Sequence, residues 1–294
     1  MRLIKPLIVS VTLITAITWW AVACHKSGST TVPFEDTPAL RPVVAGIADE
    51  ASGIADSYRN PGFLWVNQDS RQPTEIYLFN HSGQFNKKIF IKNVTNRDWE
   101  EISLGNGPVD GKKYLYIGET GDNDEIFNDY IFYRMEEPAS GIDTVSQTDA
   151  IHFKYPDGPH DSEAFFVDDA SKDIYIITKR DAKSKVYKLA YPQSTTSTNM
   201  ASFVTDLPYA GVVSACYSSS QKEMLIKTYT DIYYYKQSSN QTISNLFAQR
   251  YQALIYQQEP QGEAVCFAND ATGFFTLSEK SFAAGVNLRF YKRK

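Results

Sequence analysis

The chain has 294 residues, a formal net charge of −5, and 19 Tyr and 17 Phe. A mildly acidic chain lacks the basic surface that binds phosphate backbones, so we exclude nucleic acid as a partner. Its three cysteines are too few for a disulfide scaffold at this length. The aromatic content and the scarcity of helical periodicity favour an all-β fold.

Residues 1–23 have the order of a lipoprotein signal peptide. Arg2 and Lys5 give the positive start, and an apolar run follows up to Cys24. The sequence Ala21-Val22-Ala23-Cys24 resembles a lipobox, which implies that Cys24 is lipidated. The alternative is an uncleaved membrane anchor, because the run is near the lower length limit for a span. Both place the protein in the bacterial cell envelope, with the periplasmic or surface side left open.

Residues 24–37 are rich in Ser, Thr, Gly and Pro and predict a flexible tether. Residues 38–294 then predict one folded domain. Loss of Arg2 and Lys5 with the signal peptide would change the net charge from −5 to −7.

The folded part is organised by a degenerate repeat of about fifty residues. Each unit has a short opening, an aromatic or β-branched strand, a polar loop and another strand. The openings lie at residues 50–54, 98–102, 161–165, 212–216 and 262–266. This recurrence predicts a five-bladed β-propeller. Six blades are the alternative, because the second unit is longer. The last unit lacks a strand, and residues 40–47 are expected to supply it and so close the ring.

The repeat is expected to bring charged side chains to one mouth of the central channel. Adjacent antiparallel strands place the start of the first strand beside the end of the second. The strand openings contribute acidic residues, namely Glu50, Glu100, Glu163 and Glu263. The loops after the second strands contribute Asp69, Asp122, Asn123, Lys179, Arg180, Lys227, Glu279 and Lys280.

Carboxylates that gather around one axis repel each other, so the mouth needs a bound cation or interleaved basic residues. The predicted metal or ligand contacts are Glu50, Asp69, Glu100, Asp122, Asn123, Glu163 and Glu263. Such an oxygen-rich, sulfur-free set suits Ca²⁺. The predicted anion contacts on the opposite arc are Lys179, Arg180, Lys227 and Lys280. The alternative is a purely structural ring, in which the acids accept hydrogen bonds from loop N–H groups.

Apart from the acidic mouth, the sequence leaves the roles of His160, Trp99 and the two cysteines of the folded part to be assigned. His160 is either a general base oriented by Asp161 or Glu163, or an exposed turn residue. Trp99 is a possible ligand contact at the mouth, whereas the core between blades is expected to contain Trp65, Tyr116, Tyr175 and Tyr234. Cys216 and Cys266 occupy equivalent places on neighbouring first strands, so their side chains point in the same rotational sense. We therefore expect buried free thiols rather than a disulfide.

Several motifs resemble a family of secreted bacterial β-propeller proteins. They include Glu50-Ala51-Ser52-Gly53-Ile54, Asp98-Trp99-Glu100, Gly121-Asp122-Asn123 and Gly262-Glu263-Ala264. The blades are more loosely similar to SMP-30/gluconolactonase, NHL and phytase-like propellers. In the lactonase group this resemblance implies a divalent cation at the mouth. The chain departs from that pattern at Val213, Ser214 and Cys216, so no catalytic role is transferred.

Two functions remain open from the sequence. The first is an envelope lipoprotein whose propeller mouth binds a small ligand, a glycan or an envelope protein, with Ca²⁺ as a possible cofactor. The second is a metal-dependent hydrolase of an ester, lactone or phosphoester. We favour the first, because the chain has none of the nucleophile or metalloprotease motifs that would indicate an enzyme.

Overall fold

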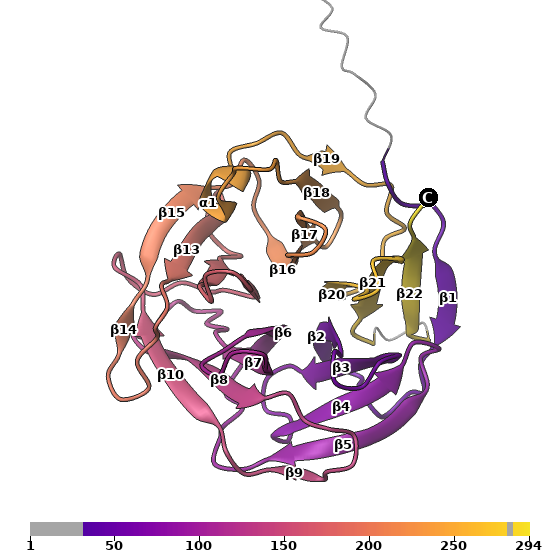
Figure 1. Cartoon of the computed structure of the whole chain (residues 1–294), viewed down its shortest axis with the longest axis horizontal. Coiled ribbons are helices and arrows are strands. Elements are labelled where there is room, and N and C mark those ends of the chain that lie inside the picture. Colours follow the sequence, from indigo (N-terminus) through magenta and orange to yellow (C-terminus); the bar gives the residue numbers. More distant parts are fainter. Residues whose placement is uncertain (1–31, 281–284) are drawn as a thin grey trace, which may run out of the picture. The chain divides into compact units, whose positions relative to one another are not determined.

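The computed structural model describes residues 32–280 and 285–294, which form a five-bladed β-propeller. Five small sheets surround a central axis, and the first strand of each blade lies innermost (Figure 1). Each innermost strand contacts the innermost strands of the two neighbouring blades, which closes the ring. The predicted signal peptide, Cys24 and residues 25–31 of the tether lie outside the described residues.

The first two blades have five strands each. Blade 1 contains, from the axis outward, β2 (Ala51–Asp56), β3 (Phe63–Gln68), β4 (Glu75–Asn80), β5 (Phe85–Ile91) and β9 (Thr144–Val145). Blade 2 contains β6 (Trp99–Asn106), β7 (Lys113–Glu119), β8 (Tyr130–Glu136), β10 (Asp149–Lys154) and β14 (Asn199–Met200).

The other three blades have four strands each. Blade 3 contains β11 (Ala164–Val167), β12 (Ile174–Ile177), β13 (Lys185–Leu189) and β15 (Ser202–Asp206). Blade 4 contains β16 (Val212–Ser218), β17 (Glu223–Thr228), β18 (Ile232–Lys236) and β19 (Gln252–Ala253), with α1 (Ile243–Leu246) before β19. Blade 5 contains β20 (Gly262–Phe267), β21 (Gly273–Ser278), β22 (Asn287–Lys292) and β1 (Ala39–Pro42).

The length of the second repeat unit has a local cause, and it does not hide a sixth blade. After β8 the chain crosses to the outer edge of blade 1, where β9 pairs in parallel with β5. It then returns to blade 2 as β10, which pairs with β8. The excursion covers two sheet edges and so reduces the unpaired backbone that exposed edges present.

The last blade is closed by the N-terminal strand, as predicted. Strand β1 pairs antiparallel with β22, with Leu40 opposite Arg289. The structure differs from the expected tether, because residues 32–37 already belong to this blade. Phe34 is 1% exposed, pairs with Arg293 across a β-bridge, and packs edge-on against Phe274. Phe34 is thus buried by a residue that lies 240 positions further along the chain, which the polar sequence around Phe34 does not indicate.

The core lies between blades, where the strands of neighbouring sheets face each other. The four aromatic residues predicted to pack there are buried, namely Trp65, Tyr116, Tyr175 and Tyr234. Over the described part of the chain, none of the helices has the length and apolar character needed to cross a membrane.

Candidate functional site

The candidate site is one mouth of the central channel, at the beginning of the innermost strands. Four of these strands carry a β-bulge there, in β2, β6, β16 and β20. The bulged residues include Glu100 and Glu101 of β6 and Glu263 of β20. A bulge places an extra residue against the partner strand and changes the direction of its side chain. It thereby turns carboxylates toward the mouth that regular alternation would place elsewhere.

The mouth gathers carboxylates into three overlapping groups. The groups are Glu50, Asp69 and Glu279; Asp69, Asp98 and Glu100; and Glu100, Asp161 and Glu163. Within each group, one oxygen per residue lies within 4.8 Å of the others. Oxygens around a single Ca²⁺ span about this distance, since each lies about 2.3–2.6 Å from the ion. The predicted convergence of Glu50, Asp69, Glu100 and Glu163 is therefore present in the geometry.

Glu100 is the central member, because it belongs to two of the three groups. Its residue exposure is 6%, and no described residue donates a hydrogen bond to its carboxylate. The Oε2 atom of Glu163 is likewise buried without a hydrogen-bond partner in the described chain. Buried carboxylate oxygens without donors are costly, so a cation between these side chains would relieve an unfavourable arrangement.

The electrostatics of the mouth show the same crowding. Burial, followed by the charges of Glu163 and Asp69, raises the pKa of Glu100 well above its usual value. Burial and Asp69 raise the pKa of Asp98 to about 7, and burial and Glu263 raise that of Glu279 to about 8. Without a cation, several of these groups therefore hold protons near neutral pH.

Two basic side chains already neutralise one side of the mouth. Lys179 donates to Glu163 and to the hydroxyl of Tyr229, 3.1 Å away. The Nε atom of Arg180 lies 2.7 Å from Asp161 Oδ2. In contrast, the described residues provide no salt bridge to Asp69, Asp98 or Glu100. The group of Asp69, Asp98 and Glu100 is therefore the best place for an added cation.

Gly121 lies directly against this group. A Cβ at this position would overlap Glu100 Oε1 and Asp98 Oδ2. The loop after β7 can approach the carboxylates this closely only because the residue has no side chain.

Another part of the rim is formed by residues of blades 4 and 5. Tyr229 donates a hydrogen bond to Glu263, which is 7% exposed. Burial raises the pKa of Glu263, while Tyr229 and Lys179 oppose the shift. Glu263 therefore lies at the mouth, where its neighbours include Tyr229, Lys179 and the carboxyl group of Glu279.

Two of the predicted ligands do not face the carboxylate groups. Asp122 accepts hydrogen bonds from the backbone N–H groups of Ile126 and Phe127 and from the Tyr130 hydroxyl. It stabilises its own loop and is not a member of the three carboxylate groups. Asn123 is exposed and accepts a hydrogen bond from Arg180, which orients the guanidinium.

The predicted basic arc is also different. Lys179 and Arg180 are paired with carboxylates of the mouth, as described above. Lys227 is fully buried and donates to the carbonyls of Thr228 and Gly262, and burial lowers its pKa to about 8. Lys280 pairs with Asp49 at 2.8 Å on the outer rim. The four cations therefore do not form a separate anion-binding arc.

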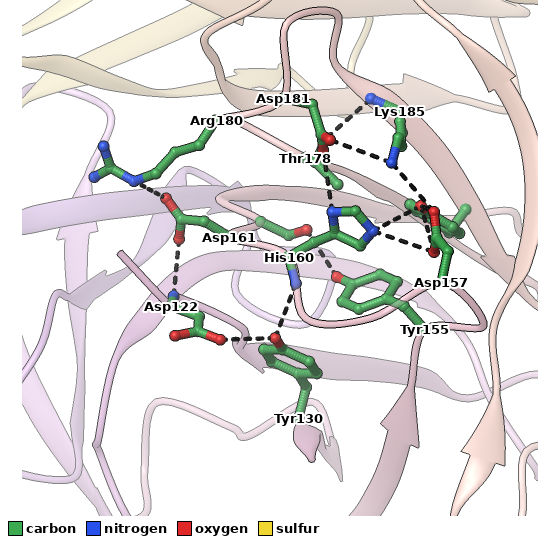
Figure 2. A network of polar contacts seen from close by, with 12 residues as sticks. Asp122, Tyr130, Tyr155, Asp157, His160, Asp161, Thr178, Arg180, Asp181 and Lys185 are labelled. Carbon is green, nitrogen blue, oxygen red and sulfur yellow. Dashed lines mark hydrogen bonds and ion pairs between the residues drawn. The ribbon is translucent and has the colours of Figure 1, made fainter. Parts of the chain in front are cut away.

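His160 is neither an exposed turn residue nor a base oriented by Asp161 or Glu163. It is 6% exposed and lies in the polar network of Figure 2. Its Nε2 atom lies 3.1 Å from Asp157 Oδ1 and 2.9 Å from the Tyr187 hydroxyl, and its Nδ1 atom lies 3.2 Å from Asp181 Oδ2. The ring therefore lies among side chains of blade 3 and its preceding loop, with hydrogen-bond partners for Nε2 and an ion-pair contact with Asp181 for Nδ1.

Trp99 does not line the mouth. It is fully buried, and its indole N–H donates to the carbonyl of Thr95 at 2.7 Å. Its place between blades 1 and 2 makes it a core residue rather than a ligand contact.

Cys216 and Cys266 are free thiols, as predicted. The Cys216 sulfur accepts a hydrogen bond from the backbone N–H of Phe267, and the Cys266 sulfur accepts one from that of Asp56. Each side chain thus points to the next blade in the same rotational sense, which keeps the two sulfurs from facing each other.

Three of the clustered acids, Asp98, Asp161 and Glu279, were not among the predicted ligands. Asp98 and Asp161 each stand two residues before a predicted ligand, Glu100 and Glu163. A shared Asp-x-Glu pattern in two openings was the available signal. Glu279 directly follows β21, at the position that Asp69 occupies after β3.

Comparisons with known proteins complete this description. Neither the family models nor the curated proteins contain a match to the sequence. Among solved structures, the chain is similar to one in a nidogen/laminin complex, with 10% identity, a TM-score of 0.46, and coverage of 79% of this chain and 73% of that one. It is also similar to the Dos1 propeller, with 10% identity, a TM-score of 0.35, and coverage of 81% and 54%. The fold assignment therefore rests on the ring of five sheets itself.

Proposed function

We propose that this protein is an envelope-anchored lipoprotein whose propeller mouth binds a divalent cation, Ca²⁺, and through it a ligand. The observation that carries this proposal is the buried carboxylate of Glu100, which lies among Asp69, Asp98, Asp161 and Glu163 and forms no salt bridge with a described residue. Ca²⁺ binds carboxylate oxygens in flexible geometry, whereas Zn²⁺ favours nitrogen and sulfur. The anchor is supported by the lipobox-like sequence that ends at Cys24.

The cation is expected at Asp69, Asp98 and Glu100, since this group has no basic partner in the described chain. Binding would displace the protons that the raised pKa values of Asp98 and Glu100 retain. The rim group of Glu50, Asp69 and Glu279 is more open to solvent, so its oxygens gain less from a cation.

The test is thermal unfolding of the purified protein with Ca²⁺ or with a chelator. At a Ca²⁺ concentration 100 times its dissociation constant, we expect about 2.7 kcal/mol of stabilisation, or roughly 5–10 °C in Tm. The Glu100→Gln variant should fold without the metal, because burial and the neighbouring acids favour an uncharged side chain at this position, but it should lose the Ca²⁺ shift.

Two further variants complete the experiment. Gly121→Ala should also lose the shift, because its Cβ displaces two of the ligands without changing the charge. Glu136→Gln is the matched control, since Glu136 is exposed and pairs with Arg59 and Lys112 outside the group. A wild-type protein that Ca²⁺ does not stabilise would support the purely structural ring instead.

The hydrolase is the weaker proposal, because a base is needed beside the cation and the ring of His160 contacts Asp157, Tyr187 and Asp181 instead of the carboxylate groups. Turnover of an ester, lactone or phosphoester panel that disappears in Glu100→Gln would reverse this order.

A further inference from the structure

We infer that the ligand of the mouth is a neutral glycan whose vicinal hydroxyl groups bind the cation directly. This inference rests on the proposed cation site. Ca²⁺ takes six to eight oxygen ligands, and three carboxylates leave part of that shell open to a ligand. The buried carboxylate oxygens of Glu100 and Glu163 lack a hydrogen-bond donor among the described residues, which indicates that the cluster binds a cation and its ligand.

The charge around the cation argues against an anionic ligand. Besides Asp69, Asp98 and Glu100, the mouth holds five further acidic side chains, namely Glu50, Asp161, Glu163, Glu263 and Glu279. Its two cations, Lys179 and Arg180, are already paired with Glu163 and Asp161. A phosphate or carboxylate would therefore face carboxyl oxygens, with neither of these two cations left unpaired to bind it.

The hydrogen-bonding character of the rim favours a ligand that carries donors. Glu50 is exposed, lies in the same group as Asp69, and receives no hydrogen bond on its carboxylate from the described residues. A sugar hydroxyl can donate to such a carboxylate while its oxygen contacts the cation, which an oxyanion cannot do. An amine can donate as well, but it has no oxygen for the metal, so it would compete with Ca²⁺.

Arg180 adds one donor to this acceptor-rich rim. Its side chain is 44% exposed and is held by Asp161 through Nε and by Asn123 through Nη2. The Nη1 group has no partner in the described chain and is available to a ring or hydroxyl oxygen. A guanidinium that is fixed on two sides loses little entropy when a ligand binds.

The experiment measures retention of the purified protein on immobilised mannan and dextran, with Ca²⁺ and with a chelator. We expect retention in Ca²⁺ on at least one of the two, release by the chelator, and loss of retention after periodate has cleaved the vicinal diols. At saturating Ca²⁺, Glu50→Ala should bind the glycan about tenfold more weakly than the wild type does, the effect of one charge-assisted hydrogen bond.

Inorganic phosphate and putrescine serve as the competing probes. Calcium binding together with no retention on either polysaccharide, or retention that survives periodate, would overturn the glycan and leave the cation site standing. Tighter binding of phosphate or putrescine than of the glycans would overturn it in the same way. Absence of calcium binding would instead contradict the proposed function.

Discussion

At the scale of single residues, the mouth shows how neighbours decide the charge of a carboxylate. Burial and the neighbouring charges of Asp69 and Asp161 raise the pKa of Asp98 to about 7. Asp157 lies outside this cluster, where Tyr187, His160 and Lys185 outweigh the effect of burial and lower its pKa to about 2. The same residue type therefore stays ionised at one site and holds a proton at another.

The raised pKa values predict a dependence of stability on pH in the metal-free protein. Asp98 and Glu279 bind a proton more tightly in the folded than in the unfolded state, where their pKa values are about 4. The folded state therefore holds more protons, and the free energy of unfolding falls as the pH rises from about 4 to about 8.

Urea unfolding with a chelator at pH 5, 6.5 and 8 measures this slope. Asp98→Asn stays neutral in both states and should flatten it, and saturating Ca²⁺ should reduce it in the wild type. A free energy of unfolding that rises across this range would contradict the assignment of protons to these carboxyls.

At the scale of elements, the edge strand β1 and the bulges of the inner strands have the strongest consequences. Strand β1 covers the open edge of β22 and joins the two ends of the described chain. Phe34 continues this closure, because it packs against Tyr234 of β18 and Phe274 of β21. The closing segment therefore links blades 4 and 5 through its side chains as well as through backbone pairing.

Phe34→Ala should destabilise the protein by about 3–5 kcal/mol, the usual cost of deleting a fully buried aromatic side chain. Equilibrium urea unfolding measures this difference. Leu40→Ala is the control from the same segment, since Leu40 is 55% exposed and should change stability by no more than about 0.5 kcal/mol. Equal, small effects of the two substitutions would indicate that residues 32–37 are a tether after all.

At the scale of the whole molecule, the ring is held together across its axis. Glu101 of β6 is 1% exposed and receives hydrogen bonds from Ser214 of β16 and from the backbone N–H groups of Ile54 and Ala215. One carboxyl group thus connects blades 1, 2 and 4. Gly53 of β2 lies against it, where a Cβ would come within 2.6 Å of Glu101 Oε1 and of the Ile102 nitrogen.

Gly53→Ala should therefore cost about 1–3 kcal/mol, because the added methyl group meets backbone as well as side chain. Thermal unfolding compared with Gly141→Ala gives the matched control, since a Cβ at Gly141 meets no atom within 4 Å. A Gly53→Ala protein as stable as the control would show that the inner strands β2 and β6 can move apart at little cost in free energy.

The sequence by itself determined the blade count, the closing strand, the aromatic core between blades, and the free cysteines. These follow from periodicity and from the position of a residue on its own strand, which are local properties. It also placed Glu50, Asp69, Glu100, Glu163 and Glu263 at one mouth, since antiparallel pairing fixes which strand ends meet.

Only the tertiary structure decided which of these acids share one site. The bulges that redirect Glu100 and Glu263 and the pairing of Lys179 and Arg180 with acids of the mouth depend on the neighbouring strands. Asp122 turns into its own loop because the backbone N–H groups of Ile126 and Phe127 bind its carboxylate. The burial of His160 and Trp99 has the same origin. The local sequence pattern determines where each strand lies. The direction of the side chains at the mouth and the pairing of their charges are determined only when five sheets pack around one axis.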